Sequence, residues 1–301
     1  MGICKDRVVI VTGAGRGLGR AYALGLAAEG AKVVVNDLGV GTHGDDTAET
    51  PAQQVVDEIR AMGGKAIANF DDVADYEAGG RIVQAALDAF GRLDAVVNNA
   101  GFVRDRMFVS CTPEEWDAVL RVHLRGHFCI SRHAVDHWRA EVKAGRKVDA
   151  RIVNTSSGAG LQGSMGQSAY SAAKAGIATL TLVQAAELAR YGITANALAP
   201  NARTRMTETA FADAMKPVEG AFDRFAPENT APLVAWLCSE GSSKVTGQVF
   251  ELIGGTIRIC LGWNDGPEYD KGSRWQAAEL GDKITELMAQ RPAPKPVYGT
   301  A

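Results

Sequence analysis

Short apolar runs rich in valine and isoleucine alternate with longer amphipathic stretches along this chain. This alternation is typical of βαβ units, in which helices connect parallel strands and cover the sheet. It predicts strands at 7–12, 32–36, 65–69, 93–97, 151–155, 193–198 and 248–253. It predicts helices at 17–29, 51–62, 75–90, 113–143, 168–190 and 227–239. We therefore expect an α/β fold in one domain, with a doubly wound, seven-stranded parallel sheet and helices on both faces.

Two segments depart from this alternation. Residues 39–50 form a polar stretch that is longer than the usual connection after a strand. Residues 255–301 follow the last predicted strand and contain a predicted helix at 274–289. We assign residues 1–254 to the sheet domain and 255–301 to a C-terminal extension, which we expect on or near the side of the functional site. Proline makes the tail at 291–301 typical of disorder.

Composition excludes several classes of partner. The formal net charge is −3, which gives no electrostatic footprint for nucleic acid, and no apolar run reaches the roughly 20 residues that span a bilayer. We expect a small-molecule partner and no membrane insertion. Five scattered cysteines and a first strand where a signal peptide would lie indicate reduced thiols and a cytoplasmic location.

The first predicted strand runs directly into a glycine-rich turn and then a helix, T12-G-A-G-R-G-L-G19. Glycines at such a turn let the backbone approach a pyrophosphate, and the helix N-terminus offers N–H groups and a positive dipole to it. The position of the motif at the start of a βαβ unit predicts a dinucleotide-binding (Rossmann) fold. The predicted phosphate-binding residues are Gly13, Gly15, Arg16, Gly17, Leu18 and Gly19.

Asp37 ends the second predicted strand, eighteen residues after Gly19. An acid at this place accepts hydrogen bonds from the adenosine ribose hydroxyls of NAD and repels the 2′-phosphate of NADP. Arg16 argues for NADP, since a cation in the loop can reach that phosphate. Because the repulsion by Asp37 is direct, we predict NAD.

Tyr170 and Lys174 lie four residues apart and project from one face of a predicted helix, and Ser157 precedes Tyr170 across a glycine-rich turn. A phenol acts as an acid or base near neutrality only if its pKa falls well below about 10. A lysine ammonium about 5 Å away supplies on the order of 3 kcal/mol toward this shift. Ser157 can hold the substrate oxygen while hydride passes between substrate and nicotinamide.

Four of the five histidines lie in one predicted helix, V122-H-L-R-G-H-F-C-I-S-R-H-A-V-D-H137. His123 and His127 have the spacing of a zinc pair, but residue 124 is leucine where a metalloprotease carries its general base, and no third ligand is evident. We therefore predict no metal site. We assign His127, His133 and His137 to helix packing or to a subunit contact.

These motifs together resemble the short-chain dehydrogenase/reductase family over about residues 5–254: T12-G-x-x-x-G-x-G19, Asp72-Val73, N98-N-A-G101, Ser157, Y170-x-x-x-K174 and Asn196-x-x-x-Pro200. The resemblance implies that Asp72 and Val73 flank the adenine and that Lys174 also holds the nicotinamide ribose. It implies a fourth catalytic residue on the helix after Trp116, where most members have asparagine and this chain has His123. That histidine either holds a relay water or accepts the proton itself, with a pKa near 6.5. The further cofactor residues that it implies are Asn99, Ala100, Gly101, Tyr170, Pro200 and Ala202.

Six stretches, among them N98-N-A-G-F-V-R-D-R-M-F108 and R121-V-H-L-R-G-H-F128, resemble one branch of that family. This branch contains the (3R)-hydroxyacyl-CoA dehydrogenase units of peroxisomal multifunctional enzyme type 2, also called 17β-hydroxysteroid dehydrogenase type 4, and bacterial single-domain relatives. It implies oxidation of a secondary alcohol, at C3 of an acyl-CoA or at C17 of a steroid. Arginines that can meet a CoA phosphate are Arg104, Arg106 and Arg203, and apolar residues that can line the pocket are Met107, Phe108, Leu161 and Met165.

Four functions therefore stay open. The leading hypothesis is an NAD-dependent 3-hydroxyacyl-CoA dehydrogenase, and the nearest alternative is a 17β-hydroxysteroid dehydrogenase. A 3-oxoacyl-carrier-protein reductase would favour NADPH, and a nucleotide-sensing scaffold would not need Ser157, Tyr170 and Lys174 together. Apolar faces on the helices at 113–143 and 168–190 predict a homodimer or a homotetramer.

Overall fold

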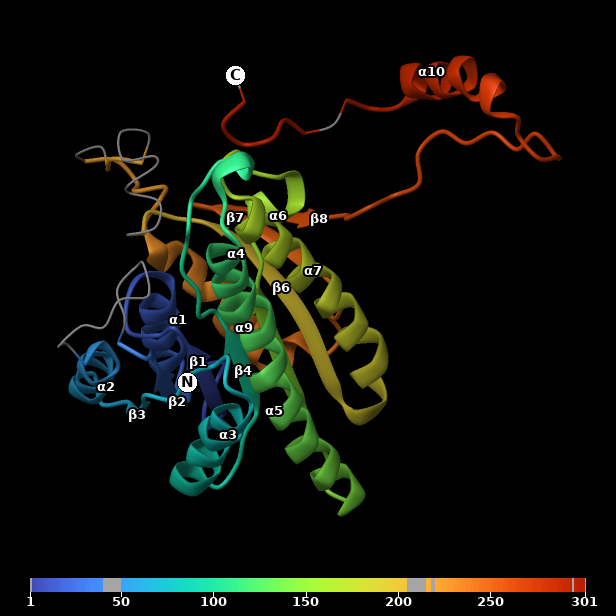
Figure 1. Ribbon diagram of the computed structural model, residues 1–301. Helices are drawn as coiled ribbons and strands as arrows, with labels where there is room; N and C mark the ends of the chain where they lie inside the picture. The colour runs from blue at the N-terminus through green and yellow to red at the C-terminus, as the bar shows by residue number, and fades with distance from the viewer. Residues whose placement is uncertain (1, 40–49, 205–214, 218–219, 294, 301) are drawn as a thin grey trace.

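Figure 1 shows the computed structural model, which describes residues 2–39, 50–204, 215–217, 220–293 and 295–300. Most of the polar stretch predicted at 39–50 therefore lies outside the described residues. The described strands form one sheet in the order β3-β2-β1-β4-β5-β6-β7-β8. Their bounds are β1 Val8–Thr12, β2 Lys32–Asn36, β3 Lys65–Asn69, β4 Ala95–Asn98, β5 Ala150–Thr155, β6 Ile193–Asn201, β7 Val249–Ile253 and β8 Thr256–Cys260.

Helices cover both faces of this sheet (Figure 1). Their bounds are α1 Gly17–Ala28, α2 Pro51–Ala61, α3 Tyr76–Phe90, α4 Pro113–Leu120, α5 Gly126–Lys143, α6 Gly158–Gln162, α7 Ser168–Leu188, α9 Ala231–Cys238 and α10 Leu280–Gln290. A π-helical turn, η2 (Arg121–Arg125), joins α4 to α5, and a 3₁₀ turn, η4 (Pro227–Thr230), precedes α9. The predicted α/β fold with a doubly wound sheet is confirmed.

Consecutive residues of each strand face opposite sides of the sheet, which explains why β1 is apolar at both sets of positions. Val9 and Val11 of β1 pack in a core with α1, α2 and α9. Val8 and Ile10 of the same strand pack in a second core with α3, α5 and α7. Because both faces are covered, polar residues within the strands would lose water, and valine and isoleucine fill these positions.

The structure differs from the predicted elements at several places, and it has a short helix, α6, within the predicted turn after Ser157. The chain makes a hairpin at Gly254-Gly255 and adds β8 antiparallel to β7, with Ile253 paired to Thr256. The predicted helix at 113–143 is continuous in the structure but contains the π-helical turn η2, through which α4 continues into α5. The helix predicted at 274–289 begins later, as α10, after a 3₁₀ turn at Ala277–Glu279.

The order of the strands reverses between β1 and β4, since β1 is followed in sequence by β2 on one side and the chain returns to β4 on the other. Ligands of open α/β sheets bind in the crevice at the carboxyl ends of the strands at such a switch point. The carboxyl ends of β1 and β4 lead into the glycine-rich turn and into the segment 98–101. The predicted site residues therefore meet at this edge of the sheet.

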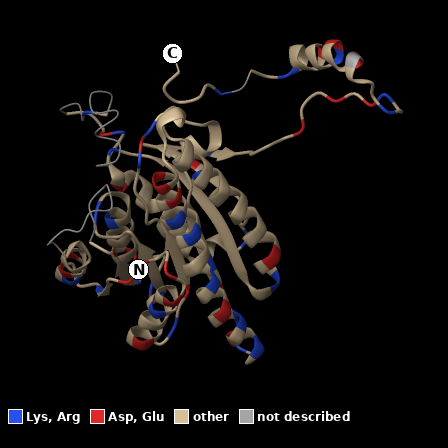
Figure 2. Ribbon diagram, in the orientation of Figure 1, with Lys and Arg blue, Asp and Glu red and all other residues tan. Residues whose placement is uncertain are grey.

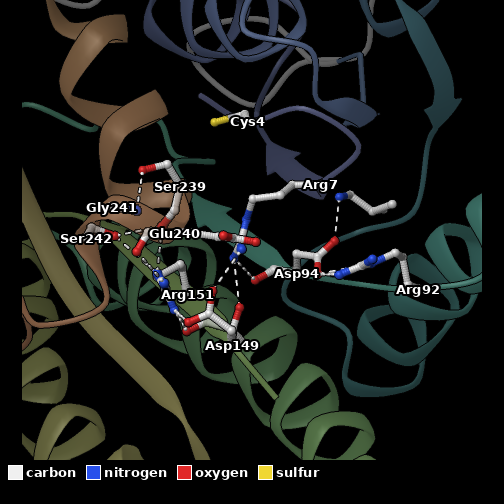
Figure 3. Close-up of polar contacts among 12 residues, drawn as sticks. Cys4, Arg7, Arg92, Asp94, Asp149, Arg151, Ser239, Glu240, Gly241 and Ser242 are labelled. Carbon is white, nitrogen blue, oxygen red and sulfur yellow. Dashed lines mark hydrogen bonds and ion pairs between the residues drawn. The ribbon is translucent and has the colours of Figure 1, made fainter. Parts of the chain in front are cut away.

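At the opposite edge, a buried ionic network joins the amino ends of the strands (Figure 3). Arg151, at the start of β5, is 1% exposed and donates from Nε to the Ser239 carbonyl oxygen at 3.0 Å and to Ser242 Oγ at 3.1 Å. Asp149 pairs with Arg151 at 2.7 Å and with Arg7, just before β1, at 3.0 Å. These contacts fasten β1, β5 and the segment after α9 to one another.

The C-terminal extension leaves the sheet after β8 and carries α10 away from the rest of the molecule (Figure 1). No described residue of α10 is buried, although Leu280, Ile284, Leu287 and Met288 lie on one face of it. Lys and Arg alternate with Asp and Glu on α10 and on the outer surface of α5 (Figure 2).

Candidate active site

The glycine-rich turn packs tightly against the end of β4. Gly13 and Gly17 have φ angles of 60° and 53°, which favour glycine. A Cβ atom at Gly19 would lie 2.0 Å from the Gly13 carbonyl oxygen, and one at Gly13 would lie 2.7 Å from Ala100 Cα. The glycines therefore allow the N-terminus of α1 to approach the carboxyl edge of the sheet closely. The first turn of α1 has no acidic residue to repel an anion.

The acid predicted to bind ribose lies directly beside this turn. Asp37 accepts hydrogen bonds from the backbone nitrogen of Gly15 at 2.8 Å and of Gly39 at 2.9 Å. Arg16 occupies the N-cap position of α1, and Leu18 packs against the first core cluster. A carboxylate next to a helix N-terminus suits the ribose and the pyrophosphate of one dinucleotide. The residues present therefore fit a nicotinamide dinucleotide.

Other predicted cofactor residues brace the same edge. Asn99 donates from Nδ2 to the carbonyl oxygens of Thr12 and Gly13 at 3.0 and 3.1 Å, while Ala100 donates its N–H to Thr12 Oγ1 at 3.1 Å. These two residues hold the glycine-rich turn against β4. Asn99 and Ala100 therefore contribute to the site by fixing the position of the backbone at Thr12 and Gly13.

Asp72 and Val73, the pair predicted beside the adenine, follow β3, which lies next to β2 on the side away from β1. Asp72 accepts from the backbone nitrogen of Ala74 at 2.9 Å and forms a 2.7 Å ion pair with Arg121, and Val73 is buried. The sequence did not indicate the ion pair, because Arg121 is 49 residues away. Pro200 and Ala202 lie at the carboxyl end of β6 and directly beyond it.

Ser157, Tyr170 and Lys174 meet at the carboxyl end of β5. Ser157 is the N-cap of α6, Tyr170 lies in the first turn of α7, and Lys174 lies one turn later. Lys174 Nζ donates to the Thr155 carbonyl oxygen at 2.6 Å and lies 5.6 Å from the centre of the Tyr170 ring. Ser157 and Tyr170 share a side-chain hydrogen bond. The structure thus brings together the three residues that the sequence grouped.

The protonation of this group differs from the sequence expectation. Burial raises the pKa of Tyr170 above its ordinary value, and the hydrogen bond with Ser157 opposes this by less. Burial also lowers the pKa of Lys174 to about 7. The expectation of a lowered phenol pKa rested on the charges of Lys174 and of an oxidised nicotinamide, and it did not include the loss of water around Tyr170 and Lys174.

His123 lies in η2 and contacts both the N98-N-A-G101 segment and Tyr170. Its Nε2 lies 2.7 Å from the Phe102 carbonyl oxygen, and its ring meets that of Tyr170 edge-on at 5.2 Å. A Cβ atom at Gly101 would lie 2.0 Å from His123 Cε1, so glycine is needed there to admit the imidazole. The Phe102 backbone nitrogen also lies 3.2 Å from Nε2, so this ring nitrogen can donate to the carbonyl oxygen or accept from the N–H, according to the tautomer. Nδ1 has no partner among the described residues.

Burial lowers the pKa of His123 to about 3, with a smaller contribution from Lys174. The imidazole is therefore neutral over the working pH range of an enzyme. A neutral buried imidazole whose Nδ1 has no partner among the described residues is suited to a hydrogen bond with a water molecule.

The other histidines occupy different surroundings. His127 is buried, and its Nε2 lies 3.3 Å from the backbone nitrogen of Thr155. His133 bonds to the Tyr76 carbonyl oxygen at 2.8 Å and thereby connects α5 to α3. Among the described residues, no three His, Cys, Asp or Glu side chains are grouped as a metal site requires.

None of the helices in the described part of the chain is both long and apolar enough to cross a bilayer.

The residues considered for the substrate are dispersed. Arg106 pairs with Glu115 at 3.1 Å, Arg203 pairs with Asp223, and Arg104 lies over the Phe102 ring. Met107 and Phe108 are exposed, and Leu161 lies in α6. Residues 296–299 belong to the extension that we expect on or near the side of the functional site, and they contact the turn between Ser157 and Tyr170, a contact that the sequence did not indicate. Their only sequence signal is a tyrosine in an otherwise proline-rich tail.

Comparison with known proteins agrees with this geometry. The family model described as short chain dehydrogenase matches residues 7–215. Peroxisomal multifunctional enzyme type 2 of Mus musculus is 49% identical over 83% of this chain, which spans 32% of that protein's length. Hydroxyacyl-CoA dehydrogenase ChsB1 of Mycobacterium tuberculosis is 42% identical over 95% of this chain and 90% of its own. The predicted resemblance to this branch is thereby confirmed.

A solved structure shares the whole fold. The crystal structure of a short chain dehydrogenase from Mycobacterium avium is 57% identical, with a TM-score of 0.90 over 99% of this chain and 100% of that one. Family, fold and site geometry agree, and the chain belongs to the short-chain dehydrogenase family, whose members are oxidoreductases that act on a CH–OH group.

Proposed function

We propose that this dehydrogenase oxidises a (3R)-hydroxyacyl-CoA to the 3-oxoacyl-CoA in fatty-acid or steroid side-chain breakdown, with NAD as the oxidant. The observation that carries the proposal is the joint arrangement of Ser157, Tyr170 and Lys174 beside the glycine-rich turn. The names of the multifunctional enzyme and of ChsB1 support the acyl-CoA as substrate class.

Each catalytic residue then has a distinct task. Ser157 Oγ donates a hydrogen bond to the substrate oxygen, and the Tyr170 phenolate takes the hydroxyl proton as the C–O bond becomes a carbonyl. Lys174 stabilises the phenolate by its charge and holds the nicotinamide ribose. When bound, NAD supplies the acceptor for the hydride from the substrate carbon. The products are the ketone, NADH and one proton.

The cofactor residues follow from the same arrangement. We assign the pyrophosphate to the turn at Gly13–Gly19, the ribose to Asp37, the adenine to Asp72 and Val73, and the nicotinamide half to 99–101, Pro200 and Ala202. The preference for NAD rests on Asp37, whose carboxylate lies 2.8 Å from the backbone nitrogen of Gly15 at the centre of the phosphate turn. A 2′-phosphate at this place would meet a like charge.

Replacement of Asp37 by serine should reverse or abolish this preference. The variant loses charged hydrogen bonds to the ribose, each worth roughly 1.5–3 kcal/mol, so kcat/KM with NAD should fall about 10-fold or more. The value with NADP should rise, because the repulsion is removed. Initial rates with both cofactors measure the ratio, and Asp88→Ser on the surface of α3 is the control. An unchanged ratio would refute the role of Asp37.

Of the two roles open for His123, the neutral imidazole supports the water holder. Replacement by asparagine should lower kcat by less than about 10-fold and leave the pH profile in place, since neither side chain titrates in the working range. Alanine, which has no acceptor, should cost more. The measurement is kcat against pH for both variants. Loss of an ionisation near pH 6.5 in His123→Asn would instead identify His123 as a proton acceptor.

The nearest alternative substrate is a 17β-hydroxysteroid, which would use the same catalytic residues. Steady-state rates with a 3-hydroxyacyl-CoA and with a 17β-hydroxysteroid separate the two, and turnover of neither would refute both. Similarity to a 3-oxoacyl-[acyl-carrier-protein] reductase of Synechocystis, 39% identical over 83% of this chain, keeps that reaction as a further candidate. It is disfavoured because Asp37 opposes NADPH.

We further propose that the chain forms a homodimer or a homotetramer through α5 and α7, and that it is cytoplasmic. A groove of about 680 Å³ lies between these helices, and its lining includes Phe128, Leu180, Val183 and Tyr191. Phe128 and Val183 are exposed although they are apolar, which is typical of a surface that a partner covers. The mass in solution distinguishes a dimer from a tetramer.

A further inference from the structure

The end of the C-terminal extension returns from α10 and pairs with the turn that follows Ser157. Tyr298 donates its backbone N–H to the Gly163 carbonyl oxygen at 3.1 Å and accepts from the Met165 nitrogen at 2.9 Å. Gln162 Nε2 donates to the Pro296 carbonyl oxygen at 3.1 Å. Residues 296–299, which we call the strap, therefore lie along this turn as a short strand lies along its neighbour.

The other side of the same turn is also held. The Arg106 nitrogen donates to the Gly166 carbonyl oxygen at 2.7 Å, and Gln167 Nε2 donates to the Asp105 carboxylate at 3.1 Å. The turn between Ser157 and Tyr170 thus lies between the strap and the segment 105–106. The position of this turn therefore depends on the strap and on the segment 105–106.

Tyr298 is the one partly buried residue of the strap. Its ring covers Gly158, the residue next to Ser157: a Cβ atom at Gly158 would lie 2.5 Å from Tyr298 Oη and 2.9 Å from its Cε2. Burial raises the pKa of the Tyr298 phenol, which is consistent with this packing. Glu251, in β7, anchors the approach to the strap through Lys295, at 3.9 Å.

The turn needs such support because of its composition. Glycine occupies positions 158, 160, 163 and 166, and two of these residues have φ angles of 82° and 75°. Glycine loses more conformational freedom on ordering than any other residue. A turn of this kind does not hold Ser157 at a fixed distance from Tyr170 by its own preferences. Contacts from outside the turn have to do so.

We propose that Tyr298 is a positioning residue, which fixes the turn between Ser157 and Tyr170 and forms, with the strap, one wall of the site for the acyl chain or steroid. Val297 and Met165 are exposed and apolar and extend this wall. The proposal rests on the proposed function in one respect, the assignment of Ser157 and Tyr170 to the reaction. The shape of the substrate site then depends on a residue, Tyr298, that lies 128 residues beyond Tyr170 in the chain.

Tyr298→Ala should lower kcat/KM for the substrate about 10- to 100-fold, because small displacements of reacting groups cost this much. The Kd for NAD should stay unchanged, since the strap makes its contacts with residues 158–165 and is distant in sequence from the phosphate-binding turn at 12–19. Tyr298→Phe should restore the activity, because ring packing on Gly158 is the contact that the structure shows. The matched control is Tyr269→Ala, which changes a tyrosine of the C-terminal extension that packs beside Trp275. Its kcat/KM should equal that of the unchanged chain.

Hydrogen exchange provides a second readout that needs no substrate. The amide of Met165 should exchange faster in Tyr298→Ala than in Tyr269→Ala, while amides of β5 stay protected. Equal exchange and equal kcat/KM in these two variants would overturn the proposal, as would failure of Tyr298→Phe to restore activity. If the unchanged chain oxidises neither substrate, the proposed function fails, whereas the exchange measurement still decides whether the strap holds the turn.

Discussion

Replacement of Tyr170 by phenylalanine should lower kcat by about 10²–10⁴-fold, the usual contribution of a positioned acid or base. The ring stays in place, so its edge-on contact with His123 and its packing in the first turn of α7 are kept. The Kd for NAD should therefore change little. Single-turnover rates and NAD titration measure the two quantities separately. A nucleotide-sensing scaffold would be indifferent to the change.

The pH dependence of the same reaction follows from the pKa directions. Burial raises the pKa of Tyr170 in the cofactor-free protein, so the phenol holds its proton at neutral pH. Oxidation needs the phenolate, and its rate should increase with pH until Tyr170 is deprotonated in the ternary complex. Tyr269→Phe serves as the control. A kcat for Tyr170→Phe within 10-fold of the control would contradict the assignment of Tyr170.

Replacement of Arg151 by alanine should lower the free energy of unfolding by about 2–4 kcal/mol, because it removes hydrogen bonds of a buried charged group that are each worth roughly 1.5–3 kcal/mol. The Arg151 side chain is 1% exposed, and its loss takes one donor from the Ser239 carbonyl oxygen and the donor of Ser242 Oγ, while Asp149 keeps its ion pair with Arg7. Urea unfolding gives the value. Arg146→Ala, which removes an exposed pair with Glu141, should cost less than about 1 kcal/mol.

Acidification offers an independent check on this network. Although burial opposes it, the guanidinium groups of Arg151 and Arg7 hold the pKa of Asp149 below its usual value. A carboxyl with a lowered folded pKa stabilises the protein above its unfolded pKa of about 3.9, and this stability is lost as the pH falls through the folded pKa. On acidification, the free energy of unfolding of Arg151→Ala should fall by less than that of the unchanged chain. Equal losses would contradict the network in Figure 3.

The parts of the fold that the sequence predicted well are those governed by local pattern. The strands at 32–36 and 65–69 have the predicted bounds, because their apolar residues are set off by polar residues and glycine. The strand β8 was missed although Gly254-Gly255 is a hairpin signal. The π-helical turn within the helix at 113–143 was missed because such a turn leaves the apolar pattern nearly unchanged.

Non-local surroundings explain what the sequence left out of the site. The grouping of Ser157, Tyr170 and Lys174 follows from helix periodicity and one short turn, and was predictable. The pKa of His123 was not, since its value of about 3 depends on burial against Gly101 and on the charge of Lys174. The strap was not predictable either, because no local pattern connects Tyr298 to Gly158.

The most direct test of the central claim follows the hydrogen at C3 of the substrate. A (3R)-hydroxyacyl-CoA that carries deuterium at C3 is incubated with the unchanged chain and NAD, and the NADH is analysed by mass spectrometry. We predict one deuterium per NADH, an equal amount of 3-oxoacyl-CoA, and little product with NADP. Absence of deuterium from the cofactor, or a clear preference for NADP, would contradict an NAD-dependent hydroxyacyl-CoA dehydrogenase.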